Sequence, residues 1–215
     1  MTIPKKALEL LREDPDDLER YAVVADQLQA RGDLRGELIA LEVTLAKTDP
    51  ASRHFVTLRR EIDRFMKLHA KHLLGGLWTA SSTSRLVWRY GFIREAALWT
   101  TATALAPPLG RRIPKPRVNK LLKQTDELMQ LESAVLLEHL TLAATYNSQL
   151  FVWDAAARVA QGAPKSLHVL DLRDLYEGAV PDWDPMFQRE LVWRRQVLTL
   201  RSDSLSLDAA AELFT

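Results

Sequence analysis

The sequence predicts an α/β (or α+β) protein in which an N-terminal helical domain caps a short array of strand–helix units with a mostly parallel sheet. Two observations lead to this fold class. Apolar residues recur with helical spacing over residues 1–78. Beyond residue 85, alternating apolar runs at 92–99, 136–143, 166–173 and 196–202 are separated by stretches with helical spacing. Strands that alternate with helices favour parallel pairing.

The first 75 residues are expected to form four helices, the first of them over 4–12. Asp14 is a natural N-cap for the second helix, and Pro15 fits its first position. Asp49-Pro50 repeats this pattern at the start of a long fourth helix, which Gly75 ends. Residues 79–84, TASSTS, are small and polar, so they are expected to link this part to the rest.

Residues 25–42, ADQLQARGDLRGELIALE, place two glycines inside a helical pattern. Gly32 stands where a left-handed C-cap belongs, and Asp33 is expected to cap the third helix. Gly36 is expected to be a small residue where two helices approach closely. A phosphate-binding loop needs successive glycine amides after a strand, and no strand is predicted here. The segment therefore predicts a corner between helices.

Leucines in the second half recur with the spacing of a leucine-rich repeat. The pattern Leu-x-x-Leu-x-Leu occurs at 137–142 and 167–172, in a weaker form at 93–98, and in part at 198–200. Leu170 follows Leu140 by 30 residues, and Leu198 follows Leu170 by 28. These periods fit one strand and one helix per unit, with helices at 117–133, 148–160, 185–195 and 206–214. The sequence thus predicts a short, degenerate solenoid of about four units over 85–215, with an insertion at 106–117. A small open α/β sheet is the competing fold.

Composition narrows the class of protein. Hydrophobic residues make up 47% of the chain, which is ample for a core, and there is no cysteine. The absence of cysteine excludes disulfides and thiolate chemistry and fits a reducing cytoplasm. The N-terminus has no apolar segment typical of a signal peptide, and no window is long and apolar enough for a membrane span. We therefore expect a cytoplasmic protein with no membrane span.

Three segments together resemble a known bacterial module. They are Asp14-Pro15-Asp16-Asp17, the helix Val24-Ala25-Asp26-Gln27-Leu28 and Arg31-Gly32-Asp33-Leu34-Arg35-Gly36-Glu37-Leu38-Ile39, and RYGFIREAAL at 89–98 is similar to the segment that leads into the first repeat strand. The module is the repeat-companion domain of leucine-rich-repeat-like proteins, common in myxobacteria and planctomycetes. Val24 and Gln27 stand where that family usually has tyrosine and tryptophan. The resemblance implies a helical cap on a repeat array and, by analogy, an interaction role; it supplies no catalytic residues.

A basic insertion is the first candidate binding site. The segment 109–123 carries six basic residues and no acid: Arg111, Arg112, Lys115, Arg117, Lys120 and Lys123. Residues 81–130 have a net charge of +6, whereas 131–215 have −5. Such a cluster is enough for sequence-independent phosphate contacts, but it has no aromatic residue for base stacking. An acidic protein partner, nucleic acid and the chain's own acidic half all remain open as its counterpart.

One face of the predicted sheet is the second candidate site. If the leucines point toward a core, alternation sends the intervening residues to the other, open face. The expected partner-binding residues there are Glu95, Trp99, His139, Thr141, Asp171, Arg173, Thr199 and Arg201. A mixed aromatic and charged surface on a solenoid is typical of partner binding. We therefore favour a non-enzymatic protein–protein interaction or adaptor module, with a nucleic-acid-associated protein as the alternative.

No catalytic or metal-binding motif is found. His69 and His72 share a helix but have no HExxH context and no carboxylate within one turn. The serines of the linker lack a nucleophile elbow, and glycine-rich phosphate loops are absent. Asp182 and Asp184 flank a tryptophan, which keeps an enzyme with an unrecognised carboxylate site as a weaker alternative. We expect no catalytic residues, no metal and no cofactor, and the oligomeric state is left open.

Overall fold

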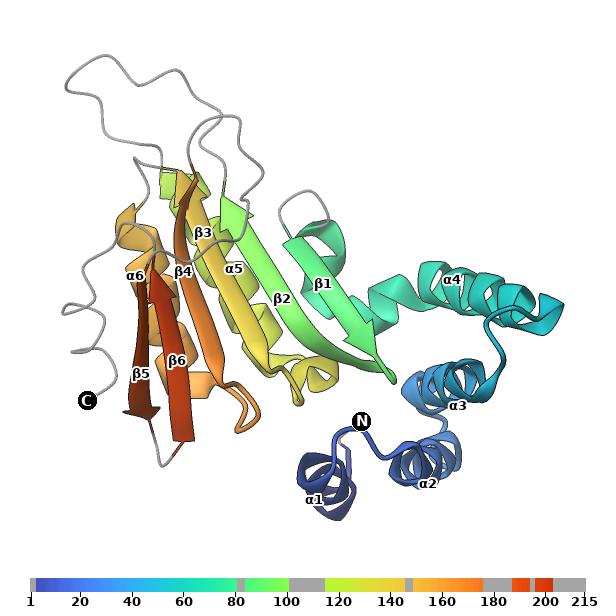
Figure 1. The fold of residues 1–215 in the computed structure, drawn as a ribbon. Coiled ribbons are helices and arrows are strands. Elements are labelled where there is room, and N and C mark those ends of the chain that lie inside the picture. Colours follow the sequence, from blue (N-terminus) through green and yellow to red (C-terminus); the bar gives the residue numbers. More distant parts are fainter. Residues whose placement is uncertain are drawn as a thin grey trace.

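The structure is a computed structural model that describes residues 3–80, 84–100, 115–145, 149–175, 187–193 and 196–202. Its N-terminal part consists of four helices, α1 (Lys5–Glu13), α2 (Leu18–Gln29), α3 (Leu34–Lys47) and α4 (Arg53–Leu74). A short 3₁₀ helix, η1 (Gly75–Ala80), leads from α4 toward the sheet (Figure 1). The four expected helices are thus present.

The rest of the described chain is a six-stranded sheet with helices on one face. The strands are β1 (Ser84–Arg89), β2 (Phe92–Thr100), β3 (His139–Thr145), β4 (Val169–Leu175), β5 (Phe187–Trp193) and β6 (Gln196–Ser202). Their order is β1-β2-β3-β4-β6-β5, in which β2, β3, β4 and β6 are parallel and the two edge strands are antiparallel. Helix α5 (Lys115–Gln130), the short η2 (Glu132–Ala134) and α6 (Gln149–Gly162) connect the parallel strands (Figure 1). The mixed α/β class with a mostly parallel sheet is therefore confirmed.

Leucines stand next to one another across the central strands of the sheet. Leu140 pairs with Leu170 and Leu170 with Leu200, so residues 30 apart in sequence stand side by side. The expected alignment of Leu198 with Leu170 is wrong by two residues. A shift of two keeps every side chain on the same face, so the hydrophobic pattern alone does not distinguish the two registers. Pairing with β4 decides between them.

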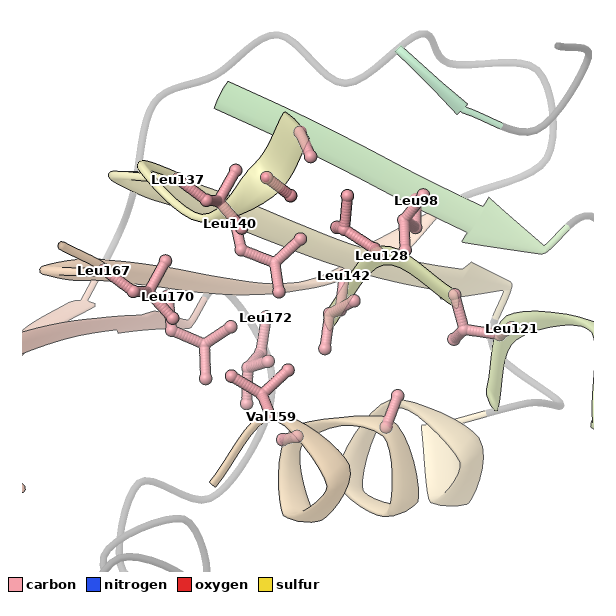
Figure 2. Packing of buried hydrophobic residues seen from close by; sticks show 14 of the residues in the cluster. Leu98, Leu121, Leu128, Leu137, Leu140, Leu142, Val159, Leu167, Leu170 and Leu172 are labelled. Carbon is pink, nitrogen blue, oxygen red and sulfur yellow. The ribbon is translucent and has the colours of Figure 1, made fainter. Parts of the chain in front are cut away.

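The main core lies between the sheet and its two helices. Leucines from β2, β3 and β4 point toward α5 and α6 and meet Leu121, Leu128 and Val159 (Figure 2). The side chains of Leu98, Leu140, Leu142, Leu170 and Leu172 are fully buried. Each contributes about 1.5–3 kcal/mol of transfer free energy. This burial explains why the leucine face of each strand turns toward the helices.

One expected helix is a strand in the structure, and one further strand was not expected. Residues 185–195 were expected to be helical, but β5 forms an antiparallel hairpin with β6 instead. Pairing with β6 supplies the backbone hydrogen bonds that a helix would otherwise provide. Strand β1 was not expected, and it pairs with β2 across a turn in which Tyr90 (φ 50°) and Gly91 (φ 72°) are both left-handed. Two such residues suit a tight hairpin. The expected helix at 206–214 lies outside the described residues.

The Asp-Pro pairs do not cap their helices. The N-cap of α2 is Asp17, whose side chain accepts from the amides of Glu19 and Arg20, and the N-cap of α4 is Ser52. Asp14 and Asp49 each stand three residues earlier, where their side chains accept from amides two residues ahead. Each Asp-Pro pair thus forms a turn that positions the N-cap residue of the following helix. Asp and Pro are both common in turns.

The corner at residues 29–36 forms as expected. Gly32 has φ +71°, and the amides of Gly32 and Asp33 donate to the carbonyls of Gln29 and Leu28 at 2.8 and 2.9 Å. These two bonds form a Schellman ending of α2. Asp33 then caps α3 by accepting from the Arg35 amide at 3.0 Å. Gly36 faces α2, since a Cβ there would lie 2.6 Å from the Gln29 nitrogen.

The β1–β2 turn packs on helices α2 and α3. The Gly91 amide donates to Glu42 Oε2 at 2.8 Å, and a Cβ on Gly91 would lie 2.6 Å from Cγ1 of Ile39. The Tyr90 ring lies 4.7 Å from the Tyr21 ring, centroid to centroid. The turn therefore joins the helical part to the sheet, and only glycine fits at position 91.

A buried ion-pair network makes a second junction. The Arg35 guanidinium donates to Asp33 in its own corner and to Glu132 of η2. Burial raises the pKa of Asp33, but the hydrogen bonds from Arg35 outweigh this effect and hold the pKa below its ordinary value. Ser133 Oγ donates to the Leu73 carbonyl at 3.3 Å beside it. The Arg-Gly-Asp corner is thus tied to the segment that precedes β3.

Among the residues that the structure describes, no helix combines the length and the apolar character needed to cross a membrane.

Gly36→Ala should destabilise the fold because the new Cβ would overlap backbone atoms of α2 at 2.6 and 2.7 Å. We expect the free energy of unfolding to fall by about 1–3 kcal/mol, measured by urea denaturation. Gly162→Ala on α6 is the matched control, since its Cβ would meet only Met129 at 3.6 Å. Equal stability of the two variants would contradict the close approach of α2 and α3.

Glu42→Gln tests the carboxylate beneath the β1–β2 turn. Burial raises the pKa of Glu42 above 4.5, and the amides of Gly91 and Tyr90 only partly offset this. Because the folded state favours the protonated acid, its contribution to stability is present below the unfolded pKa and is lost as pH rises through the folded pKa. The free energy of unfolding of Glu42→Gln, relative to wild type, should therefore increase from about pH 4 to about pH 7.

Chemical denaturation across this pH range measures the effect. Glu61→Gln is the control for removing a carboxylate, because Glu61 is exposed on α4. A relative stability of Glu42→Gln that does not change with pH, or that falls as pH rises, would contradict the buried carboxylate.

Candidate functional site

The sheet face opposite α5 and α6 carries the predicted site residues in rows. One row is Glu95–His139–Val169–Thr199, the next is Ala97–Thr141–Asp171–Arg201, and the third is Trp99–Ala143–Arg173. All eight predicted residues lie on parallel strands and at alternate positions to the buried leucines. For Arg173, Thr199 and Arg201 the structure describes the backbone position alone.

A histidine–carboxylate pair lies at the centre of this face. His139 Nε2 is 2.8 Å from Oδ2 of Asp171 on the neighbouring strand. The Asp171 side chain is 1% exposed and that of His139 is 30% exposed. The buried carboxylate therefore fixes the orientation of a ring that solvent reaches.

The accessible part of the face is smaller than the sequence predicts. Thr141 and Asp171 are buried, as are the small residues Ala97 and Ala143 between them. Glu95 is exposed, and Trp99 and His139 are half-buried. The expectation of an open surface across all strands thus differs from the structure in its middle, where small and bonded side chains are closed off. Among the side chains that the structure describes on this face, those that solvent reaches lie on β2 and β3.

The described part of the basic segment lies on α5, away from this face. Arg111 and Arg112 lie outside the described residues, and Lys115 and Arg117 are in the first turn of α5. Lys120 is exposed on α5, and Lys123 lies 3.7 Å from Glu127 one turn later. Because α5 covers the leucine face of the sheet, its described lysines stand on a different surface from Glu95 and Trp99 (Figure 1).

Within the part of the chain that the structure describes, the remaining chemical candidates do not gather into a site. The His69 ring packs against Phe65 at 4.4 Å, centroid to centroid. Asp182 and Asp184 lie outside the described residues. In the described ranges, no group of three or more histidines and carboxylates is placed to hold a metal ion.

The structure contains a basic groove that the sequence did not predict. It lies between α1 and the starting ends of β2, β3 and β4, has a volume of about 280 Å³, and is lined by Arg12, Arg94 and Lys165 among others. These residues are far apart in the chain, and no local motif joins them. The groove could have been predicted only from the order of the strands, because residues that precede parallel strands meet at one edge of a sheet.

Comparison with known proteins supplies no further guide: no family model, no curated protein and no solved structure matches the chain. Functional inference therefore rests on the geometry of its own residues. The resemblance of residues 14–39 and 89–98 to the repeat-companion domain stays a prediction from the sequence.

A double-mutant cycle on His139→Ala and Asp171→Ala tests the central pair. Each single variant leaves the other polar group without its bond, so we expect coupling of about 1–3 kcal/mol in the free energy of unfolding. The pair His139→Ala and Asp154→Ala is the control, since Asp154 is exposed on α6. Additive losses for His139 and Asp171 in urea denaturation would show that the pair does not hold the ring.

Proposed function

We propose that this chain is a non-catalytic protein-interaction module that binds its partner over β2 and β3, at Glu95, Trp99 and His139. The observation that carries the proposal is the held imidazole: Asp171 anchors His139 at 2.8 Å, directly across from the exposed Glu95. The half-buried Trp99 lies two rows further along β2 on the same face. Such an arrangement loses little side-chain freedom on binding, which favours affinity.

The chemistry of the three residues defines the partner. Glu95 is exposed, and none of the ion pairs of the described residues includes it, so it calls for a cationic group. Trp99 offers a flat apolar surface, and tryptophan dominates many protein interfaces. The partner in this proposal therefore presents a lysine or arginine and, roughly 13 Å away along β2, an apolar side chain, because Glu95 and Trp99 stand four residues apart on that strand.

The same proposal includes a degenerate repeat architecture and an adaptor role in the cytoplasm. The 30-residue steps from Leu140 to Leu170 and from Leu170 to Leu200, each matched by strand pairing, support the repeat. The β5–β6 hairpin departs from it, because a strand replaces the helix of that unit. Membership of the repeat-companion class is supported by the motif residues at the two junctions, and a reducing location by the absence of cysteine.

Quantitative affinity capture from the cells that naturally express the chain tests this function. Trp99→Ala and Glu95→Lys should each reduce recovery of the partner about tenfold or more, as expected for removal of an interface anchor. Lys120→Ala with Lys123→Ala on α5 is the control and should leave recovery unchanged. Far-ultraviolet circular dichroism and thermal unfolding establish that every variant is folded.

The opposite pattern would overturn the proposal. If the α5 variants abolish capture, and nuclease or moderate salt does the same, the basic segment binds nucleic acid instead. If all variants recover the same proteins equally, the β2–β3 surface is not the binding site.

A further inference from the structure

The basic groove lies where three strands start. The Glu138 amide donates to the Arg94 carbonyl at 2.8 Å, and the His168 amide donates to the Glu138 carbonyl at 3.0 Å. These bonds align Arg94, Glu138 and His168 across β2, β3 and β4. Helix α1 and Pro15 close the opposite side, leaving a cavity of about 280 Å³. That volume suits a small ligand or a single functional group of a larger one.

Positive charge exceeds negative charge in the groove. Arg12, Arg94 and Lys165 line it together with one carboxylate, Glu138, which is bonded to Nη1 of Arg94. Near the groove, Glu13 of α1 pairs with Arg20 at 3.1 Å. The groove therefore has a net positive charge at neutral pH.

Two guanidinium groups in the groove have unused donors. The Nε atoms of Arg12 and Arg94 are enclosed and have no hydrogen-bond partner among the described residues. Arg94 is 5% exposed, so solvent does not provide an acceptor. An enclosed N–H without an acceptor costs about 1–3 kcal/mol, and such groups in native proteins commonly mark a missing water or ion.

Three hydrogen bonds hold the Arg94 guanidinium in place. Its Nη2 donates to the Tyr21 hydroxyl and to the Pro15 carbonyl at 3.3 Å, and Nη1 donates to Glu138. Its Nη1 and Nη2 atoms thus have hydrogen-bond acceptors, whereas its Nε has none among the described residues. An oxygen atom of a ligand bound in the groove would supply the acceptor that this N–H lacks.

We propose that this groove binds an oxyanion, the carboxylate or phosphate group of a small ligand, through the guanidinium groups of Arg12 and Arg94 with Lys165 adding positive charge. Arginine is suited to this role because its planar donors match the oxygens of carboxylate and phosphate. The site is independent of the proposed partner surface, because none of the residues that line it is Glu95, Trp99 or His139.

Isothermal titration of the full chain with inorganic phosphate, and separately with succinate, tests the site at constant ionic strength set by chloride. We expect at least one of the two to bind with 1:1 stoichiometry. Binding of phosphate alone assigns the site to phosphate groups, and binding of succinate alone assigns it to carboxylates. Arg12→Gln and Lys165→Gln should each weaken binding about tenfold or more, in line with loss of a charge-assisted bond.

Lys120→Gln on α5 is the matched control, because it removes one positive charge from an exposed position outside the groove. Two results would overturn the proposal. One is absence of heat from both anions in a protein whose fold is intact by circular dichroism. The other is that the Arg12→Gln and Lys165→Gln variants bind the anion with the same affinity as the Lys120→Gln control. Lys165→Gln keeps the test valid if Arg12→Gln fails to fold.

Discussion

The buried guanidinium of Arg94 holds the two parts of this protein together. It reaches the Tyr21 hydroxyl of α2, the Pro15 carbonyl between α1 and α2, and Glu138 before β3. Burial raises the pKa of the Tyr21 phenol, although Arg94 itself lowers it, so the tyrosine remains a neutral partner. Loss of one member of such a network leaves buried polar groups without bonds, which costs several kcal/mol. The position of the helices relative to the sheet depends on this cluster.

The segments that resemble the repeat-companion module mostly act at the junctions between helices and sheet. Arg35 joins its own cap Asp33 to Glu132, and the turn at Tyr90 and Gly91 packs on α2 and α3. Short recurring motifs with glycine, aspartate and arginine often indicate chemistry in a sequence. In this fold they are explained by close backbone approach, helix capping and buried ion pairs, so function must be sought at other residues.

The two proposed sites use different properties of the same sheet. The β2–β3 surface depends on side-chain alternation, which places Glu95 and His139 side by side on the face away from the helices. The groove depends instead on the shared starting edge of parallel strands, where Arg94, Glu138 and His168 align. The N-terminal helices affect the second site directly, since Arg12 of α1 lines it. In this proposal the N-terminal helices therefore do more than cover the end of the sheet, because they complete a ligand groove.

Local patterns in the sequence determined most helices, four of the strands and the leucine face of the sheet, because period and capping are properties of neighbouring residues. They also predicted which residues share the candidate face, since strand alternation carries over to every parallel neighbour, and the rows across β2, β3 and β4. Only the tertiary structure decided the rest. Asp17 and Ser52 cap their helices because the preceding turns position them, β5 is a strand because β6 offers a partner, and Leu200 rather than Leu198 meets Leu170. The groove is basic because segments up to about 150 residues apart converge there, from Arg12 to Lys165, and no local pattern records which of them meet.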